Sequence, residues 1–263
     1  MHVAESTPKM FGALFDAHTL REETILFDPL LLPERGQRNS RGITRVEVKL
    51  DVSMACTTDI HETGMVLWPV SRYLCWYLLS VCDCGDEGQR MNWKTLKGKS
   101  VIELGSGTGL CGLMLSCMGT CESVLLTDGE DIVMDVLTAN CAKRAEKSTT
   151  AELLRWGKDC TASLEKRHFD IIIGADVLAY TLGDPELLIS TVRAIMDNNG
   201  AEIFICGFSN RAENHRRRVF DVAKIYGLSI QLVPPSEFLP SPVPDDIAGI
   251  SKNMQILIFR ASA

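Results

Sequence analysis

From residue 99 to the C-terminus, short apolar runs alternate with segments of helix length. The strand-like runs occupy residues 100–104, 123–127, 151–155, 169–174, 201–206, 228–233 and 254–259. The helix-length segments span residues 109–118, 131–146, 184–197 and 210–226. This alternation predicts an α/β fold with a mostly parallel sheet and helices on both faces, because parallel strands need crossover connections. No helix-length pattern separates the last two runs, so we expect these two strands to pair antiparallel.

The length of the chain, 263 residues, is compatible with one large α/β domain. Residues 1 to about 40 lack a sustained periodicity, whereas residues 43–52 alternate apolar and polar side chains and predict a half-buried strand. We therefore predict a partly irregular N-terminal appendage over residues 1–41 and a single domain over residues 42–263.

Three features bear on the cellular compartment. The N-terminus lacks a basic start followed by an apolar core, so we expect no secretory signal. The one stretch of membrane length, residues 65–82, contains Pro69 and Arg72, which predicts a mostly buried helix beginning near Pro69 and no membrane span. Ten cysteines without a CxxC pair and five scattered histidines do not form a zinc pattern. We expect reduced thiols, no metal and a cytoplasmic location, with the nucleus as a second compartment.

The charge balance narrows the range of partners. With 27 basic and 34 acidic residues, the net charge is −7, which suits a basic partner and disfavours a nucleic acid. The one basic cluster, Arg211 to Arg218, predicts a solvated helix face, with a docking site for an acidic partner or nucleic acid as the alternative. We expect the chain to be a monomer.

The strongest local motif is a strand that runs into alternating glycines and then into a helix. It reads VIELGSGTGLCGL, and glycines allow a backbone to approach a ligand closely. The dinucleotide pattern GxGxxG would need glycine at Leu110, which disfavours a nicotinamide-dependent oxidoreductase. A GxGxG loop preceded by an acid, here Glu103, is instead usual in proteins that bind S-adenosylmethionine. A plain tight turn is the alternative.

A second signal is Asp128, which ends the next strand 21 residues after Gly107. A carboxylate at this position can accept hydrogen bonds from both ribose hydroxyls of a nucleotide-like ligand. The alternative is an N-cap for the following helix, although Asp131 could fill that role. We therefore favour the ligand role.

Five motifs occur together and in a known order: GMVLWPVSRYL, VIELGSGTGLCGL, LLTD, LRWGKD and FDIIIGADVLAY. In this order the chain resembles the seven-strand protein methyltransferases of methyltransferase family sixteen, over about residues 42–260. Many members of that group methylate protein lysines, and the GMVLWP motif is most similar to the branch of histone-arginine methyltransferase-like members. The resemblance implies a Rossmann-like seven-stranded methyltransferase sheet, S-adenosylmethionine as the cofactor and a protein substrate with a basic side chain.

The resemblance also implies the cofactor-binding residues. The matching positions are Trp68, Gly105, Ser106, Gly107, Asp128, Trp156 and Ala175. The three loop residues match the cradle for the methionine part, and the carboxylate matches the ribose-binding acid. Trp68 matches a side chain that lines the cofactor site, and Trp156 matches one that packs beside the adenine. Ala175 matches a backbone contact to the cofactor. An aromatic face can stabilise a sulfonium cation by about 0.5–2 kcal/mol, although buried tryptophans are more often core residues.

Asp176 follows Ala175, after the predicted strand over residues 169–174, where the transferred methyl group is expected. The family usually has an aromatic residue three positions after this acid, but this chain has Ala179 there and Tyr180 one position later. We predict that Asp176 orients the acceptor amine or stabilises its charge, and that Tyr180 forms a wall of the substrate channel. The predicted activity is methylation of a protein lysine. The alternatives are an arginine or small-molecule acceptor, or an inactive cofactor-binding adaptor, which Ala179 would suit.

Overall fold

The structure is a computed structural model, and it describes residues 20–33, 45–53, 61–82, 96–143, 148–157, 160–179 and 184–262. The strands are β1 (Leu20–Phe27), β2 (Val46–Ser53), β3 (Ser100–Leu104), β4 (Ser123–Asp128), β5 (Thr149–Leu153), β6 (Ile171–Ala175), β7 (Ile203–Ser209), β8 (Leu228–Val233) and β9 (Met254–Ala261). The α-helices are α1 (Pro69–Val81), α2 (Leu110–Met118), α3 (Asp131–Ala142), α4 (Glu186–Asn199), α5 (Glu213–Ile225) and α6 (Asp245–Ala248).

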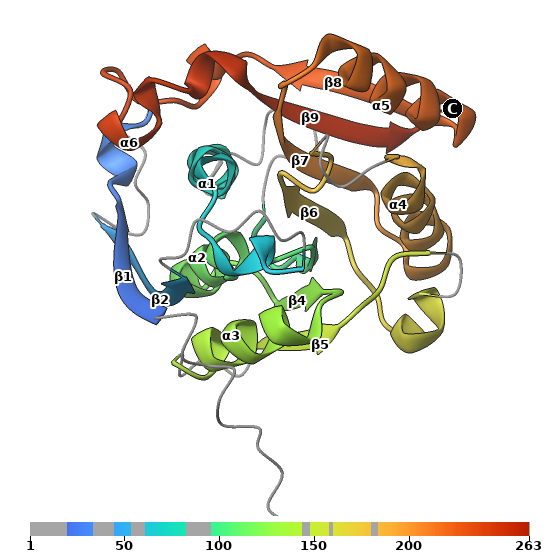
Figure 1. Cartoon of the computed structure of the whole chain (residues 1–263), viewed down its shortest axis with the longest axis horizontal. Helices are drawn as coiled ribbons and strands as arrows, with labels where there is room; N and C mark the ends of the chain where they lie inside the picture. The colour runs from blue at the N-terminus through green and yellow to red at the C-terminus, as the bar shows by residue number, and fades with distance from the viewer. Residues whose placement is uncertain are drawn as a thin grey trace, which may run out of the picture.

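A seven-stranded sheet occupies the centre of the molecule (Figure 1), in the order β5-β4-β3-β6-β7-β9-β8. Strands β3 to β7 pair parallel, and β9 pairs antiparallel with both β7 and β8. The antiparallel pairing follows because only α6, a single turn, and short 3-10 turns lie between β8 and β9. The predicted fold class and the antiparallel last pair are confirmed. The ends of the predicted elements differ from the observed ones by a few residues.

Two hydrophobic cores lie on opposite faces of the sheet, because successive side chains of a strand point to opposite sides. On β6, Ile171 and Ile173 belong to the core that α1 and α2 cover, whereas Ile172 belongs to the core that α4 and α5 cover. On β7, Ile205 and Phe204 divide in the same way. Figure 1 shows these two groups of helices on the two sides of the sheet.

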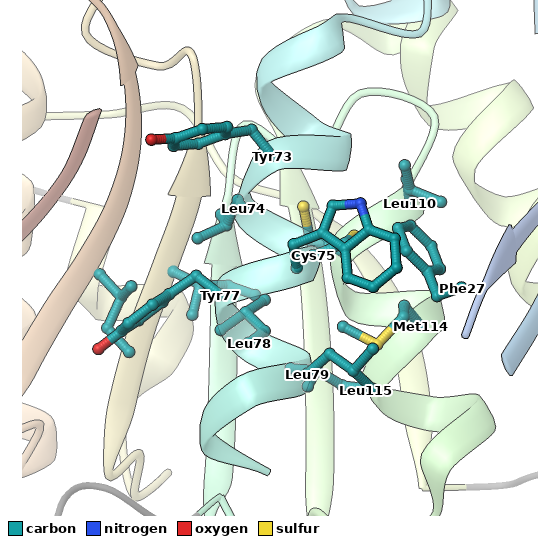
Figure 2. Close-up of a cluster of buried hydrophobic side chains, with 14 of the residues drawn as sticks. Phe27, Tyr73, Leu74, Cys75, Tyr77, Leu78, Leu79, Leu110, Met114 and Leu115 are labelled. Atoms are coloured by element: carbon teal, nitrogen blue, oxygen red, sulfur yellow. The ribbon is translucent and has the colours of Figure 1, made fainter. Parts of the chain in front are cut away.

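Helix α1 begins at Pro69, as predicted, and is buried on nearly all sides. In Figure 2 its Tyr73 and Tyr77 lie on one side of the helix, while Phe27 and Met114 lie on the other. The phenolic O–H of Tyr73 donates to the carbonyl of Met254 over 3.2 Å, which ties the helix to β9. In the described part of the chain, no helix combines the length and apolar character needed to cross a bilayer.

The first strand, β1, has no counterpart in the sequence prediction. It pairs antiparallel with β2, from Leu20 opposite Ser53 to Phe27 opposite Val46. Its first half is polar and exposed, so only its second half alternates buried and exposed residues, which is too short a signal to detect. Its buried residues join the core around α1 and α2. The predicted boundary between residues 41 and 42 lies outside the described residues and stays a prediction.

Candidate active site

The carboxyl ends of the parallel strands meet at one edge of the sheet, which is where open α/β sheets bind ligands. Gly105 follows β3, Asp128 ends β4, and Asp176 follows β6. Trp156 follows β5, three residues after its last residue, and Arg211 follows β7. The tertiary structure therefore gathers residues from five strand ends into one region.

The glycine loop packs tightly against other segments. Gly105 and Gly107 have φ values of +63° and +54°, which favour glycine. A Cβ atom on Gly105 would lie 2.7 Å from Cγ1 of Val177 and 3.2 Å from Cζ2 of Trp156. A Cβ atom on Gly107 would lie 2.7 Å from the carbonyl oxygen of Gly64. Packing within the protein thus already requires these two glycines, and their contact with a ligand stays a prediction.

The same loop is hydrogen-bonded to the neighbouring strand β4. The Ser106 N–H donates to the carbonyl of Thr127 over 2.8 Å, and the Thr127 N–H donates to the Ser106 hydroxyl over 3.0 Å. Oδ2 of Asp128 accepts from the Gly107 N–H over 3.0 Å, and Oδ1 accepts from the Glu130 N–H over 3.2 Å. Burial raises the pKa of Asp128, and these hydrogen bonds oppose the rise.

Asp128 is not the N-cap of α3. Glu130 holds that position and makes no side-chain cap hydrogen bond. The capping interpretation is therefore wrong, and the carboxylate instead lies at the strand edge, bonded to the glycine loop.

Glu103 lies beneath the loop, in the middle of the fold. Its side chain is 1% exposed, and its Oε2 accepts from the Gly112 N–H over 3.0 Å, which joins β3 to α2. Burial raises the pKa of Glu103 to about 7. The acid in front of the glycines is thus a buried structural group that titrates near neutral pH.

Asp176 forms the second part of the site. It has a φ of +59° and hydrogen-bonds through its N–H to the carbonyl of Gly207 over 2.8 Å. Its Oδ2 lies 2.5 Å from Nη2 of Arg211, and its Oδ1 is buried without a hydrogen-bond partner among the described residues. Burial raises the pKa of Asp176, and the Arg211 guanidinium opposes the rise. A non-glycine residue at positive φ with an unpaired buried oxygen is typical of functional sites.

Trp68 joins this group through Arg211. The Cζ atom of Arg211 lies 5.7 Å from the centre of the Trp68 ring, within cation–π range. The Nε1–H of Trp68 donates to the carbonyl of Thr63 over 2.9 Å, which holds the ring in place. The predicted residue Trp68 and the predicted residue Asp176 are therefore linked by a side chain that the sequence analysis did not select.

The sequence predicts that Arg211 belongs to a solvated helix face. Its side chain is 39% exposed, but it lies before α5 and its guanidinium pairs with Asp176. Arg217 and Arg218 behave as predicted, since Arg217 is 76% exposed and Arg218 pairs with Asp184 on the surface. His215 is buried and Arg216 is 26% exposed, so these two members are not on a solvated face. One sequence signal could have separated Arg211 from them. It stands two residues after the end of β7, at the same sheet edge as Asp176.

The remaining predicted residues lie around the end of β6. Ala175 is the last residue of the strand and pairs with Gly207 of β7. Ala179 is buried, and its N–H donates to the carbonyl of Asp176 over 3.0 Å, closing a turn. Tyr180 lies outside the described residues, so its role stays a prediction. Within the described part of the chain, no group of three or more His, Cys, Asp or Glu residues could hold a metal ion.

Comparison with known proteins gives the fold first. A solved structure from Streptococcus mutans, described as a SAM-dependent methyltransferase, superposes with a TM-score of 0.52 at 11% identity. The match covers 82% of this chain and 53% of that chain. Identity this low shows the fold alone. The fold is that of the Rossmann-like methyltransferases.

Sequence comparison gives the family. The lysine methyltransferase family profile matches residues 49–224, more than half of the chain. Protein N-lysine methyltransferase METTL21A of Xenopus tropicalis is 35% identical over 137 residues, which are 49% of this chain and 55% of the relative. Histone-arginine methyltransferase METTL23 of Mus musculus is 28% identical over 140 residues, which are 52% of this chain and 50% of the relative. The chain belongs to the lysine methyltransferase family, and it spans about half the length of these two relatives.

The described residues fit the cofactor that this family implies. S-adenosylmethionine carries a cationic sulfur, an amino group and ribose hydroxyls, which call for acceptors and aromatic faces. The strand edge offers the carboxylate of Asp128 and the rings of Trp68 and Trp156. These acceptor and aromatic groups match the chemistry of the cofactor.

Proposed function

We propose that the protein is an S-adenosylmethionine-dependent methyltransferase whose acceptor is a lysine side chain of a protein. The observation that carries the proposal is the buried Asp176 carboxylate, with one unpaired oxygen, at the strand edge beside the glycine loop. Family membership and the METTL21A relatives support lysine as the acceptor.

The proposed roles follow from the position of each residue. When bound, S-adenosylmethionine supplies a methyl group on a positively charged sulfur, which becomes a neutral thioether once an amine nitrogen takes the methyl. Asp128 would accept the ribose hydroxyls, the glycine loop would hold the methionine part, and Trp156 would pack beside the adenine. Asp176 would orient the acceptor amine. Positioning of this kind provides much of the rate enhancement in such reactions, because the methyl group is already activated.

The protonation state of the acceptor limits the reaction. A lysine amine has a pKa of about 10.4 in water and attacks only as the neutral amine. An oxygen of Asp176 that accepts an N–H of the amine would point the nitrogen lone pair away from the carboxylate and toward the methyl group. Tyr180 would form part of the channel wall.

The test uses tritiated S-adenosylmethionine and a cell lysate. We expect a labelled protein band whose hydrolysate contains methylated lysine. Methylated arginine would favour an arginine acceptor, for which the METTL23 relatives are the supporting observation. A labelled small metabolite would favour a small-molecule acceptor. S-adenosylhomocysteine binding without any label would favour an inactive cofactor-binding adaptor.

Asp176→Asn is the sharpest variant for this assay. Asparagine tolerates positive φ better than alanine, so the turn is retained while the negative charge is lost. We expect transfer to be abolished and S-adenosylhomocysteine binding, measured by calorimetry, to change by less than about threefold, since the proposed cofactor contacts stay in place. Asp197→Asn, at an exposed ion pair on α4, is the matched control. Transfer at the wild-type rate in Asp176→Asn would contradict the proposed role of Asp176.

Partners and location are proposed from the sequence together with the structure. The net charge of −7 supports a basic protein substrate. Among the described residues, Cys75, Cys111, Cys121 and Cys206 are free thiols, which supports a reducing compartment, the cytoplasm or the nucleus. We also propose a monomer that binds no nucleic acid; gel filtration and a nucleic-acid binding assay test these two points.

A further inference from the structure

Arg211 connects three segments at the candidate active site. It follows β7, its Nη2 lies 2.5 Å from Oδ2 of Asp176 after β6, and its Cζ lies 5.7 Å from the ring of Trp68 before α1. Its side chain is 39% exposed, whereas that of Asp176 is 7% exposed. The guanidinium therefore lies between a buried carboxylate and solvent, with an aromatic face beside it.

The ion pair uses only one oxygen of the carboxylate. Nη2 of Arg211 bonds Oδ2, while Oδ1 is buried and has no hydrogen-bond partner among the described residues. A buried acceptor without a partner is costly, and a donor on a ligand is one way to satisfy it. The geometry thus leaves Oδ1 for a donor that is not part of the described chain.

The surroundings of Asp176 show why a cation is needed there. Burial disfavours the charged form of the carboxyl, and Arg211 is the charged group in direct contact that favours it, with a smaller contribution from a backbone hydrogen bond of Ser209. Two other titratable groups lie on the same side. The Cys206 thiol of β7 is fully buried, and His215 of α5 bonds through Nε2 to the carbonyl of Leu178 over 2.8 Å. Arginine differs from both because it is permanently charged.

We propose that Arg211 is a positioning residue for methyl transfer: by binding Oδ2 it keeps Asp176 ionised and leaves Oδ1 to accept a hydrogen bond from the acceptor amine. This inference rests on the proposed function, because it assigns Arg211 a role at the same site. An ionised carboxylate accepts hydrogen bonds with both oxygens, whereas a carboxylic acid donates from one of them. The pair is also neutral overall, so it holds the acceptor amine as an ammonium ion less strongly than a lone carboxylate would.

The first experiment measures Asp176 directly and needs no substrate. The protein is labelled with ¹³C-aspartate, and the Asp176 carboxyl signal, assigned with Asp176→Asn, is followed by NMR as the pH is raised. In Arg211→Met we expect its titration midpoint to rise by at least one pH unit, because the buried carboxyl loses its cation. Arg211→Lys should recover most of this shift. If Arg211→Met does not fold, Arg211→Gln replaces it.

The matched control is Arg217→Met. It removes the same charge from the same basic cluster, but Arg217 is 76% exposed and its Nε lies 3.8 Å from Oε1 of Glu213. We expect its Asp176 midpoint to equal that of the wild type. Cys206 and His215 are present in every variant, so neither residue distinguishes the variants. An unchanged midpoint in Arg211→Met would overturn the inference, whatever the activity.

The second experiment asks whether transfer depends on the ion pair. Tritium transfer into lysate protein is measured from pH 6 to pH 9.5 with saturating S-adenosylmethionine. In Arg211→Met we expect the low-pH limb of the profile to move to higher pH by the same amount as the NMR midpoint. Below the midpoint that NMR gives for this variant, its transfer relative to the wild type should fall about tenfold per pH unit and should recover above that midpoint, while Arg217→Met should follow the wild type.

The outcomes separate the inference from the proposed function. If the wild type transfers methyl groups but the Arg211→Met profile is unchanged, the inference alone is overturned. If the wild type labels no acceptor at any pH, the proposed function fails, and with it the role of Arg211 in transfer. A midpoint shift together with a matching profile shift supports both.

Discussion

The backbone N–H of Gly107 donates a hydrogen bond to Oδ2 of Asp128 over 3.0 Å, so the loop after β3 is bonded to the end of β4. This bond joins the two strongest signals of the sequence into one structural unit. A carboxylate that holds the glycine loop and also faces the strand edge can couple loop geometry to ligand binding.

Asp128→Asn should weaken cofactor binding. The amide keeps the size of the side chain but replaces one acceptor oxygen with an NH₂ donor. That donor would face the N–H of either Gly107 or Glu130, so one of these two hydrogen bonds would be lost. We expect the Kd for S-adenosylhomocysteine, measured by calorimetry, to rise by about tenfold or more, equivalent to ~1.4 kcal/mol. Asp131→Asn, at an exposed carboxylate paired with Arg155, is the control and should bind normally. Equal affinities for the two variants would remove Asp128 from the cofactor site.

Gly107→Ala should destabilise the glycine loop beyond the cost of its backbone conformation. Gly119, which ends α2, has a similar φ of +56°, but a Cβ atom there meets nothing within 4 Å. Gly119→Ala should therefore lower the free energy of unfolding by about 1 kcal/mol, the cost of a left-handed alanine. Gly107→Ala adds the overlap with the Gly64 carbonyl and should lose about 3 kcal/mol and most cofactor binding. Urea unfolding and calorimetry measure both; a similar loss for the two variants would contradict the packing argument.

Glu103→Gln should remove a pH dependence of stability. Burial raises the pKa of Glu103 to about 7 from 4.5, so folding favours the protonated carboxyl. Its contribution is complete below pH 4.5 and is lost as the pH rises to about 7, by about 3 kcal/mol in total. Glutamine does not titrate. The free energy of unfolding of the variant, relative to that of the wild type, should therefore rise by this amount between pH 4.5 and pH 8.

Urea unfolding at several pH values measures this difference. The exposed Glu202→Gln is the control, and its stability should run parallel to that of the wild type. A constant difference between Glu103→Gln and the wild type across this range would show that the carboxyl ionises normally.

Phe27→Ala should show that β1 belongs to the same folding unit as the central sheet. Phe27 is 2% exposed and packs edge-on against Trp76 of α1, with ring centres 5.4 Å apart. Removing a buried ring of this kind costs about 3–5 kcal/mol. Leu26→Ala, next along the same strand and 46% exposed, should cost less than about 0.5 kcal/mol. Thermal unfolding of both variants measures this, and an unaffected Phe27→Ala would make residues 20–33 a separate appendage.

Local patterns were enough to predict the sheet, because each strand or helix is encoded within a short window. Val101 to Leu104 is a mostly apolar run followed by Gly105, which predicts a strand, and the alternation that comes after it predicts parallel pairing. The antiparallel last pair also followed from the lack of a helix-length pattern before β9. Gly107 and Asp128 could be selected for the same reason, since Gly107 lies in the loop after one predicted strand and Asp128 directly follows the next.

Other features could not be predicted because they depend on contacts between distant segments. Strand β1 is exposed and polar over its first half, and it becomes recognisable only when paired with β2. The raised pKa of Glu103 comes from burial on all sides, which no spacing in the sequence reports.

The sequence by itself determined the fold class, the glycine loop and the acids at the strand ends, because periodicity and turn chemistry act over neighbouring residues. Only the tertiary structure decided the partners of those acids. Arg211 looked like one member of a solvated basic run, yet the parallel pairing of β6 and β7 brings it 2.5 Å from Asp176, 35 residues earlier in the chain. A buried charge needs a counter-ion, and strand order and packing determine which residue supplies it.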